Sequence, residues 1–199
     1  NVIWLCTSTV FVDHHHKICF VHIPRTGGSW LGYKMMEYSP NTYKGIGAEV
    51  FTDTEKHDVG RHTTLSNIYN YCDVDPYYKF TVVRNPYTRF ISTWVYFTRY
   101  MDTAKRANLK SPSQLMDWIE NKNTKQHVLP QAHWHDKRFN HVYKFEELKL
   151  LNLSKWIPRW NNKKGKIAPT QHTIKLKDNL KQRIFNFYRD DFELFGYSR

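Results

Sequence analysis

The segment KICFVHIPRTGGSWLG, Lys17–Gly32, constrains the fold of this chain more than any other. Its apolar first half, interrupted by a single histidine, predicts a short buried strand. Pro24 ends that strand because it has no N–H to donate to a neighbouring strand. Gly27 and Gly28 then allow backbone angles that other residues avoid, and they let the chain approach a ligand closely. The apolar spacing that follows is helical, so the segment predicts a strand, a turn and a helix.

This arrangement favours the binding of an anion. The backbone N–H groups and the positive end of the helix dipole point to one place after the glycines. Arg25 would add a full positive charge, and Thr26 and Ser29 would add hydroxyl donors. The net charge of +12, from 30 Lys and Arg against 18 Asp and Glu, also favours an anionic partner. Charge alone does not choose among nucleic acid, a polyanionic sugar and a phosphate-bearing small molecule.

A second segment, YYKFTVVRNPYTRFISTWVYF at Tyr77–Phe97, repeats the pattern. An apolar strand runs into Arg84, and an Asn-Pro pair then begins a helix. Arg84 would stand at the carboxyl end of the strand, where ligands gather in open α/β sheets. Ser92 follows about two helical turns later, and the two side chains are candidates to bind one phosphate. The alternative is that Arg84 pairs with a carboxylate and Ser92 is a solvated helix residue.

The rest of the chain predicts one α/β domain over residues 1–199. Strands are expected at Lys17–Ile23, Tyr78–Val83 and His141–Phe145, and helices at Trp30–Tyr38, Thr63–Tyr71, Pro86–Met101, Ser111–Asn121 and Lys177–Tyr188. Strands that alternate with helices predict a parallel central sheet flanked by helices. The basic segment Asn161–Thr173 is the best candidate for a mobile lid or for a loop that grips a phosphate.

Several of these motifs resemble those of a known enzyme family. HIPRTGGSW resembles the 5′-phosphosulfate loop of sulfotransferases, and VVRNPYTRFIS resembles their 3′-phosphate-binding segment, with Arg84 and Ser92 at the matching places. GRHTTLSNIY, VYKFEEL and FYRDDFELFGY are similar to parts of the carbohydrate sulfotransferases. PTQHTIKL is similar to a segment of the uronosyl 2-O-sulfotransferases of glycosaminoglycan synthesis. The resemblance spans Lys17–Tyr197 and implies the P-loop-NTPase-like sulfotransferase fold.

The resemblance implies 3′-phosphoadenosine 5′-phosphosulfate (PAPS) as donor and adenosine 3′,5′-bisphosphate as product. The donor-binding residues implied are Arg25, Thr26, Gly27, Gly28, Ser29, Trp30, Arg84 and Ser92. Lys164 and Lys166, with Lys163, either close over the nucleotide or meet an acidic acceptor, or they belong to a solvated basic loop. Two positions depart from the family pattern. Arg25 stands where the family usually has Lys, and Trp30 replaces a Thr or Ser.

Sulfuryl transfer requires a general base for the acceptor hydroxyl, and histidine is the usual choice. His62 lies between the two phosphate motifs at the start of an expected helix, where the resemblance also places a catalytic base. His57 and His22 are the alternatives. Arg25 is the second catalytic candidate, as an electrostatic clamp on the leaving phosphate. The acceptor implied is a hydroxyl of an acidic or neutral glycan.

Other readings of the sequence remain in competition. The charge and the interleaved aromatic residues would also suit a non-catalytic module that binds a polyanion such as a glycan or nucleic acid. The loop is not a Walker A motif, because GxxxxGK[ST] is absent. An ATP-dependent kinase is disfavoured because no apolar strand ends in an Asp that could hold Mg²⁺ near the two motifs. The run His14–His16 invites a metal site, but consecutive residues of an extended chain point to alternate sides, and no metal is expected. His133, Trp134 and His135 line an acceptor site or form a polar surface segment with one buried tryptophan.

Composition bears on the compartment only weakly. No apolar run approaches about 18 residues, so no membrane span is expected, and no basic segment marks a signal peptide. Cys6, Cys19 and Cys72 form no CxxC pair, so no disulfide framework is expected. The compartment follows from the source: the cytoplasm for a microbial or viral chain, and the Golgi lumen for one whose N-terminal anchor was removed. No nucleic-acid partner is expected.

Overall fold

The computed structural model describes residues 10–38, 62–70, 72–100, 109–121, 125–157, 160 and 174–199. The chain divides into two compact units. We call Asn1–Val83 with Trp134–Ile167 the sheet unit, and Arg84–His133 with Ala168–Arg199 the helical unit. Each is described by itself, and the single domain expected over residues 1–199 stays a prediction.

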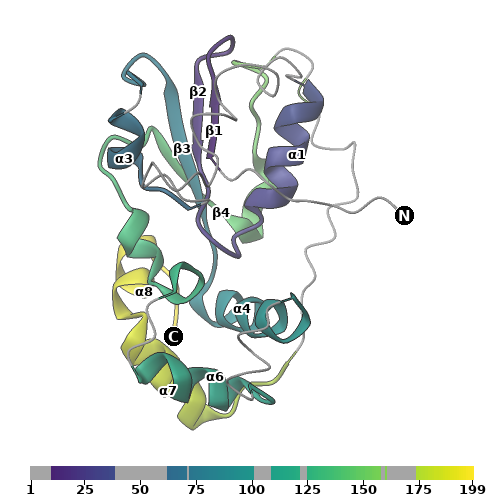
Figure 1. Cartoon of the computed structure of the whole chain (residues 1–199), viewed down its shortest axis with the longest axis vertical. Coiled ribbons are helices and arrows are strands. Elements are labelled where there is room, and N and C mark those ends of the chain that lie inside the picture. The colour runs from purple at the N-terminus through teal and green to yellow at the C-terminus, as the bar shows by residue number, and fades with distance from the viewer. Residues whose placement is uncertain are drawn as a thin grey trace. The chain divides into compact units, whose positions relative to one another are not determined.

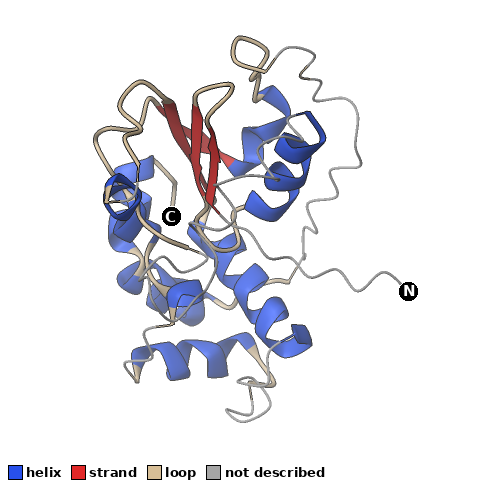
Figure 2. Cartoon of the chain, turned by 45° about the horizontal axis from the view of Figure 1, so that its top comes forward, coloured by secondary structure: helices blue, strands red, loops and turns tan. Residues whose placement is uncertain are grey.

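The sheet unit contains a mixed four-stranded sheet (Figures 1 and 2). Its strands, in spatial order, are β1 (Val10–Asp13), β2 (Ile18–Val21), β3 (Tyr78–Val83) and β4 (His141–Lys144). The strands β2, β3 and β4 are parallel, which confirms the α/β class and all three strands expected from the sequence. Strand β1, which the sequence did not lead us to expect, adds an antiparallel edge strand beside β2.

A polar turn joins β1 to β2. Oδ1 of Asp13 accepts hydrogen bonds from the backbone N–H groups of His15 (3.0 Å) and His16 (2.9 Å). Lys17 then adopts a φ of 54°, the left-handed conformation that reverses the chain. Asp13 therefore shapes the hairpin in the manner of an Asx turn. The histidine run is part of this turn.

The sheet packs against α1 (Gly28–Tyr38) on one side, and α3 (Leu65–Tyr69) lies on the other (Figure 1). Helix α3 begins where the Thr64 hydroxyl accepts a hydrogen bond from the N–H of Asn67. The core of the sheet unit consists of Phe11, Ile18, Phe20, Leu31, Met35, Phe80, Val82, Leu148, Leu151, Leu153, Ile157 and Trp160. Leu31 and Met35 are four residues apart, so one stripe of α1 covers the sheet.

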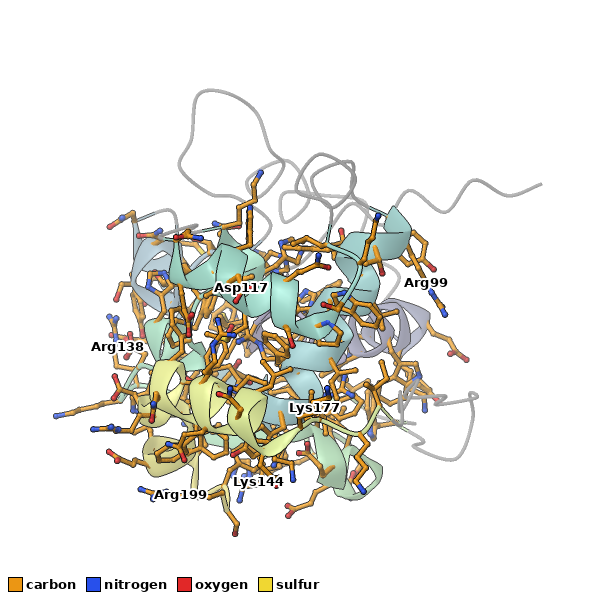
Figure 3. The ribbon with its side chains drawn as sticks, turned by 90° about the horizontal axis from the view of Figure 1, so that it is seen from below. Arg99, Asp117, Arg138, Lys144, Lys177 and Arg199 are labelled. Atoms are coloured by element: carbon orange, nitrogen blue, oxygen red, sulfur yellow. The ribbon has the colours of Figure 1, made fainter. Side chains whose placement is uncertain are left out.

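The helical unit contains the helices α4 (Pro86–Tyr100), α6 (Pro112–Glu120), α7 (Asp178–Phe187) and α8 (Arg189–Phe195). It also contains the short 3₁₀ turns η2 (Gln126–Val128) and η3 (Gln131–Trp134), although Trp134 itself belongs to the sheet unit. Helix α7 packs against α4 and α6. Ser111 caps α6 through a capping box with Gln114, as the Ser-Pro pair at this point of the sequence predicts. Asp117 of α6, labelled in Figure 3, accepts a hydrogen bond from Arg183 of α7 (2.6 Å).

The core of the helical unit consists of Phe90, Ile91, Val95, Phe97, Leu109, Leu115, Met116, Ile119, Val128, Leu176, Leu180, Ile184, Phe185, Tyr188 and Phe192. The helices expected in this part of the chain are confirmed, with ends that differ by one residue. Helix α8 was not expected. Among the residues that the structure describes, no helix has the length and apolar character needed to cross a membrane.

Candidate functional site

The turn between β2 and α1 carries the first group of predicted site residues. Arg25 adopts a φ of 67° and Gly27 a φ of 88°, so both occupy the left-handed region. Thr26 is fully buried, and its hydroxyl donates a hydrogen bond to the carbonyl of Ile23 (2.8 Å). That bond closes the turn on itself. The hydroxyl proton of Thr26 is therefore used inside the protein, and its backbone N–H is the group that it can offer a ligand.

The two glycines of the turn are required by close packing against the protein's own side chains. A Cβ atom at Gly28 would lie 1.9 Å from Cδ2 of His22, and one at Gly27 would lie 2.8 Å from the ring of Phe145. Sequence reasoning expected Gly28 to make room for a ligand. The structure shows that it makes room for an imidazole.

The remaining predicted residues of the turn differ in exposure. Arg25 and Trp30 are half-buried, whereas Ser29 is exposed in the first turn of α1. Lys34 was not among the residues predicted from the sequence. It is a buried residue of the same helix, and its Nζ lies 5.5 Å from the ring centres of both Trp30 and Trp160. Burial lowers the pKa of Lys34, and the nearby Glu37 opposes that shift. Its signal in the sequence was a lysine four residues after Trp30, on the same face of the helix.

His62, the predicted general base, is buried beside this turn, within the sheet unit. Its Nδ1 lies 3.1 Å from the backbone carbonyl oxygen of His22, and the two imidazole rings meet edge to face with centres 4.9 Å apart. A carbonyl oxygen only accepts hydrogen bonds, so this contact assigns the proton of the neutral ring to Nδ1. The lone pair then lies on Nε2, which is the atom that can take a proton from a substrate.

Trp134 holds the backbone of His62. Its indole N–H donates a hydrogen bond to the carbonyl oxygen of His62 (2.8 Å), and the ring is 1% exposed. His133 and His135, on either side, are exposed. These exposures agree with a polar surface segment that has one buried tryptophan, and the acceptor-site role of the two histidines stays a prediction. The role of Trp134 escaped the sequence analysis because it depends on a contact between residues 72 positions apart.

The start of α3 is tied to the segment after Trp134 by an arginine. The guanidinium of Arg138 donates to both carboxylate oxygens of Asp136 (2.9 and 2.6 Å) and to the hydroxyl of Ser66 (2.8 Å). It also lies over the ring of Tyr69, 4.3 Å from the centre. These bonds lower the pKa of Asp136 to about 2, with the Arg138 side chain as the largest cause. Thr63, next to His62, has a buried hydroxyl that finds no hydrogen-bond partner in the described part of the chain.

Arg84 and Ser92, the predicted 3′-phosphate ligands, belong to the helical unit, and both are buried. The interpretation of Ser92 as a solvated helix residue is wrong, because it is 4% exposed. Nε of Arg84 donates a hydrogen bond to the hydroxyl of Thr88 in the first turn of α4 (3.0 Å). The backbone N–H of Arg84 donates to Oε1 of Gln131, and Nε2 of Gln131 donates to the carbonyl of Arg84, both at 2.8 Å.

Two predicted parts of the site, His57 and the basic segment at residues 161–173, lie outside the described residues. The roles of Lys163, Lys164 and Lys166 therefore stay predictions. His14 and His16 bond Tyr77 and Asp13 within the protein (2.5 and 2.7 Å). Within the ranges that the structure describes, no group of three or more His, Cys, Asp or Glu side chains could hold a metal ion.

Comparison with known proteins identifies the family. A family model described as the sulfotransferase family matches residues 8–198, which is nearly the whole chain. No curated protein and no solved structure matches. The mixed four-stranded sheet flanked by helices agrees with the α/β fold of that family. The chain therefore belongs to the sulfotransferase family, whose enzymes transfer a sulfuryl group from a donor to an acceptor.

Proposed function

We propose that this enzyme transfers the sulfuryl group of PAPS to a hydroxyl of a carbohydrate acceptor, with His62 as the general base. The observation that carries the proposal is the contact between Nδ1 of His62 and the carbonyl oxygen of His22 (3.1 Å). It leaves Nε2 of the neutral ring as the proton acceptor, on a residue held next to the glycine turn. Family membership favours this enzyme over a non-catalytic polyanion-binding module and over an ATP-dependent kinase.

The turn before α1 would bind the phosphosulfate. The backbone N–H groups of residues 26–29, the positive end of the α1 dipole and the guanidinium of Arg25 are suited to an anion. Arg25 holds its left-handed conformation without being glycine. Such strain is retained where the surrounding structure imposes it, often at functional sites. We assign Arg25 the role of stabilising charge on the leaving phosphate, which a guanidinium can do through two parallel hydrogen bonds.

Arg84 and Ser92 would bind the 3′-phosphate. Both residues are buried. A charge-assisted hydrogen bond to a phosphate is stronger at such a buried site than at an exposed one. Their contribution is to hold and orient the donor, because the 3′-phosphate takes no part in bond breaking. Trp30, Lys164 and Lys166 stay part of the proposed donor-binding set.

The proposed sulfuryl transfer is a single displacement at sulfur. The acceptor hydroxyl oxygen bonds to sulfur while its proton passes to Nε2 of His62. The bond between sulfur and the bridging oxygen of the phosphosulfate breaks, and adenosine 3′,5′-bisphosphate leaves with the electron pair. Arg25 and the backbone N–H groups of the turn stabilise the charge that develops there. The carbohydrate acceptor is proposed on the resemblance of PTQHTIKL to the uronosyl enzymes.

The test begins with a screen in which PAPS is supplied to the purified chain with a panel of sugars and small hydroxyl compounds, and products are detected by their gain in mass. With an acceptor in hand, His62→Gln is expected to lower turnover about 10²- to 10⁴-fold. Affinity for adenosine 3′,5′-bisphosphate, measured by calorimetry, should stay within about twofold, because the base does not bind the nucleotide. His15→Gln, which changes an exposed histidine of the β1–β2 turn, is the matched control and should leave both values unchanged. Retained turnover in a folded His62→Gln protein would exclude His62 as the base.

A further inference from the structure

We propose that Gln131 is a positioning residue for Arg84 and sets the affinity of the enzyme for the 3′-phosphate of its donor. This inference rests on the proposed function, in which Arg84 binds that phosphate. Gln131 belongs to η3 in the helical unit and is completely buried. Neither composition nor local pattern marked it, because the two residues lie 47 positions apart.

Gln131 pairs both backbone groups of Arg84. Its Oε1 accepts the hydrogen bond of the Arg84 N–H, and its Nε2 donates to the Arg84 carbonyl, each at 2.8 Å. The side-chain amide thus makes the two backbone hydrogen bonds that a neighbouring strand would make to a residue inside a sheet. Arg84 follows directly after β3, which pairs with β4 only as far as Val83. The glutamine therefore fixes the main chain of Arg84 where the strand ladder has ended.

Asp191 of α8 holds the glutamine in turn. Nε2 of Gln131 donates a hydrogen bond to Oδ2 of Asp191 (3.2 Å), and the backbone N–H of Ala132 donates to Oδ1 (2.8 Å). Asp191 is completely buried, and that burial raises the pKa of its carboxyl. Both protons of the Gln131 amide are thus engaged, one by Arg84 and one by Asp191. The reversed orientation of the amide would set its oxygen against the carbonyl of Arg84, so the amide has one favourable orientation.

The side chain of Arg84 leaves this fixed main chain in a defined direction. Its Nε donates to the hydroxyl of Thr88 (3.0 Å), and that hydroxyl donates to the carbonyl of Asn85 (3.1 Å). An arginine side chain loses much rotamer freedom when it binds a phosphate. Holding both its backbone and its Nε beforehand lowers that entropic cost on binding. Loosening Gln131 should therefore weaken the contact that Arg84 makes and leave contacts elsewhere on the nucleotide intact.

The test compares two nucleotides that differ only in the 3′-phosphate, namely adenosine 3′,5′-bisphosphate and adenosine 5′-monophosphate. Calorimetric titrations of the full chain should show that the wild type prefers the bisphosphate. Gln131→Met keeps the size of the side chain and removes its hydrogen bonds. It should lower affinity for the bisphosphate about tenfold and affinity for the monophosphate less than about twofold, since only the 3′-phosphate contact depends on Arg84.

A double-mutant cycle separates positioning from a general structural effect. Arg84→Met should abolish the preference for the bisphosphate, and adding Gln131→Met to it should then lower the affinity no further. Tyr188→Phe is the matched control, because it removes another buried hydrogen bond of the same unit, to the carbonyl of Val128 (2.8 Å), and should leave the preference unchanged. Should Gln131→Met fail to fold, Asp191→Asn alters the carboxylate that holds the Gln131 amide, and a smaller loss in the same direction is expected.

The outcomes are distinct. A selective loss of bisphosphate affinity in Gln131→Met or Asp191→Asn supports the inference. An equal loss for both nucleotides, or a preference that Gln131→Met leaves at its wild-type value, overturns the inference and leaves the proposed function standing. A wild-type protein that does not distinguish the two nucleotides overturns the proposed function, and the inference with it.

Discussion

The imidazole of His22 lies directly against the backbone of Gly28. The three atoms closest to a Cβ built at Gly28 all belong to that ring, at 1.9, 2.4 and 2.5 Å. The carbonyl oxygen of His22 faces Nδ1 of His62. One residue at the end of β2 therefore contacts both the turn proposed to bind phosphosulfate and the histidine proposed to act as base. A displacement of His22 would move both groups together.

Gly28→Ala is expected to destabilise the protein by about 2–4 kcal/mol, because the added methyl overlaps a buried ring. His22→Ala alone should cost about 2–3 kcal/mol, from the contacts and the volume lost. In the double variant the methyl at position 28 enters the space that the His22 ring has left. Its loss of unfolding free energy should therefore be at least about 1 kcal/mol smaller than the sum of the two single losses. Unfolding in urea measures all three values. Strict additivity would show that the two residues do not press on each other in solution.

Arg25→Gly should separate stability from activity. Glycine relieves the left-handed backbone, so the free energy of unfolding is expected to stay at the wild-type value or to rise by up to about 1 kcal/mol. Turnover should fall about 10²- to 10³-fold, as the loss of a charge-stabilising donor commonly does. Lys17→Gly is the control, because Lys17 also has a positive φ (54°) but lies in the β1–β2 turn. It should show a similar change in stability and unchanged turnover. Full activity in Arg25→Gly would remove Arg25 from the proposed mechanism.

Trp134→Phe should lower turnover while donor affinity stays the same. The phenyl ring still fills most of the buried site, but it cannot donate to the carbonyl of His62. We expect turnover to fall roughly three- to tenfold as His62 loses its alignment, since small displacements of a base are costly. Trp160→Phe is the matched control. It removes another indole hydrogen bond in the same unit, one that is donated to the carbonyl of Leu151 (3.2 Å) and not to His62. Equal losses of turnover in both variants would argue for a general packing effect.

Asp136 should make the free energy of unfolding depend on pH in the acidic range. Its pKa is lowered to about 2 by the Arg138 side chain, so its contribution is present above the unfolded-state pKa near 4 and is lost as the pH falls toward 2. Asp136→Asn is expected to cost about 1 kcal/mol at pH 7, a figure reduced because Arg138 is partly exposed to solvent. The difference from the wild type should shrink between about pH 4 and pH 2. Urea unfolding at pH 7, 4 and 2.5 measures it, with the exposed Glu193→Gln as control. A difference that does not change with pH would contradict the assignment.

Local pattern was sufficient for the elements that position the proposed site. The apolar runs before the two arginines predicted β2 and β3, and the proline and glycine signals predicted where each strand stops. The period of the apolar residues predicted α1 and α4. Pattern failed for β1, because its short apolar run is followed by histidines, and the chain turns there only because the Asp13 carboxylate accepts hydrogen bonds from the backbone N–H groups of His15 and His16. The positive φ of Gly27 agrees with the backbone freedom expected of it. The close packing of Gly28 against His22 could not be predicted, since it is a tertiary contact.

Sequence alone thus established the order of strand, turn and helix, since this order depends on the periodicity of neighbouring residues. The two phosphate motifs, and the choice of His62 that the family resemblance supported, stay predictions from the sequence. The tertiary structure decided how His62 is held, through Trp134 and the carbonyl of His22, and how Arg84 is held, through Gln131 and Asp191. These partners are 40 to 72 residues apart along the chain. No local period encodes such a pairing, because it arises only when folding brings buried polar groups to the partners that replace water.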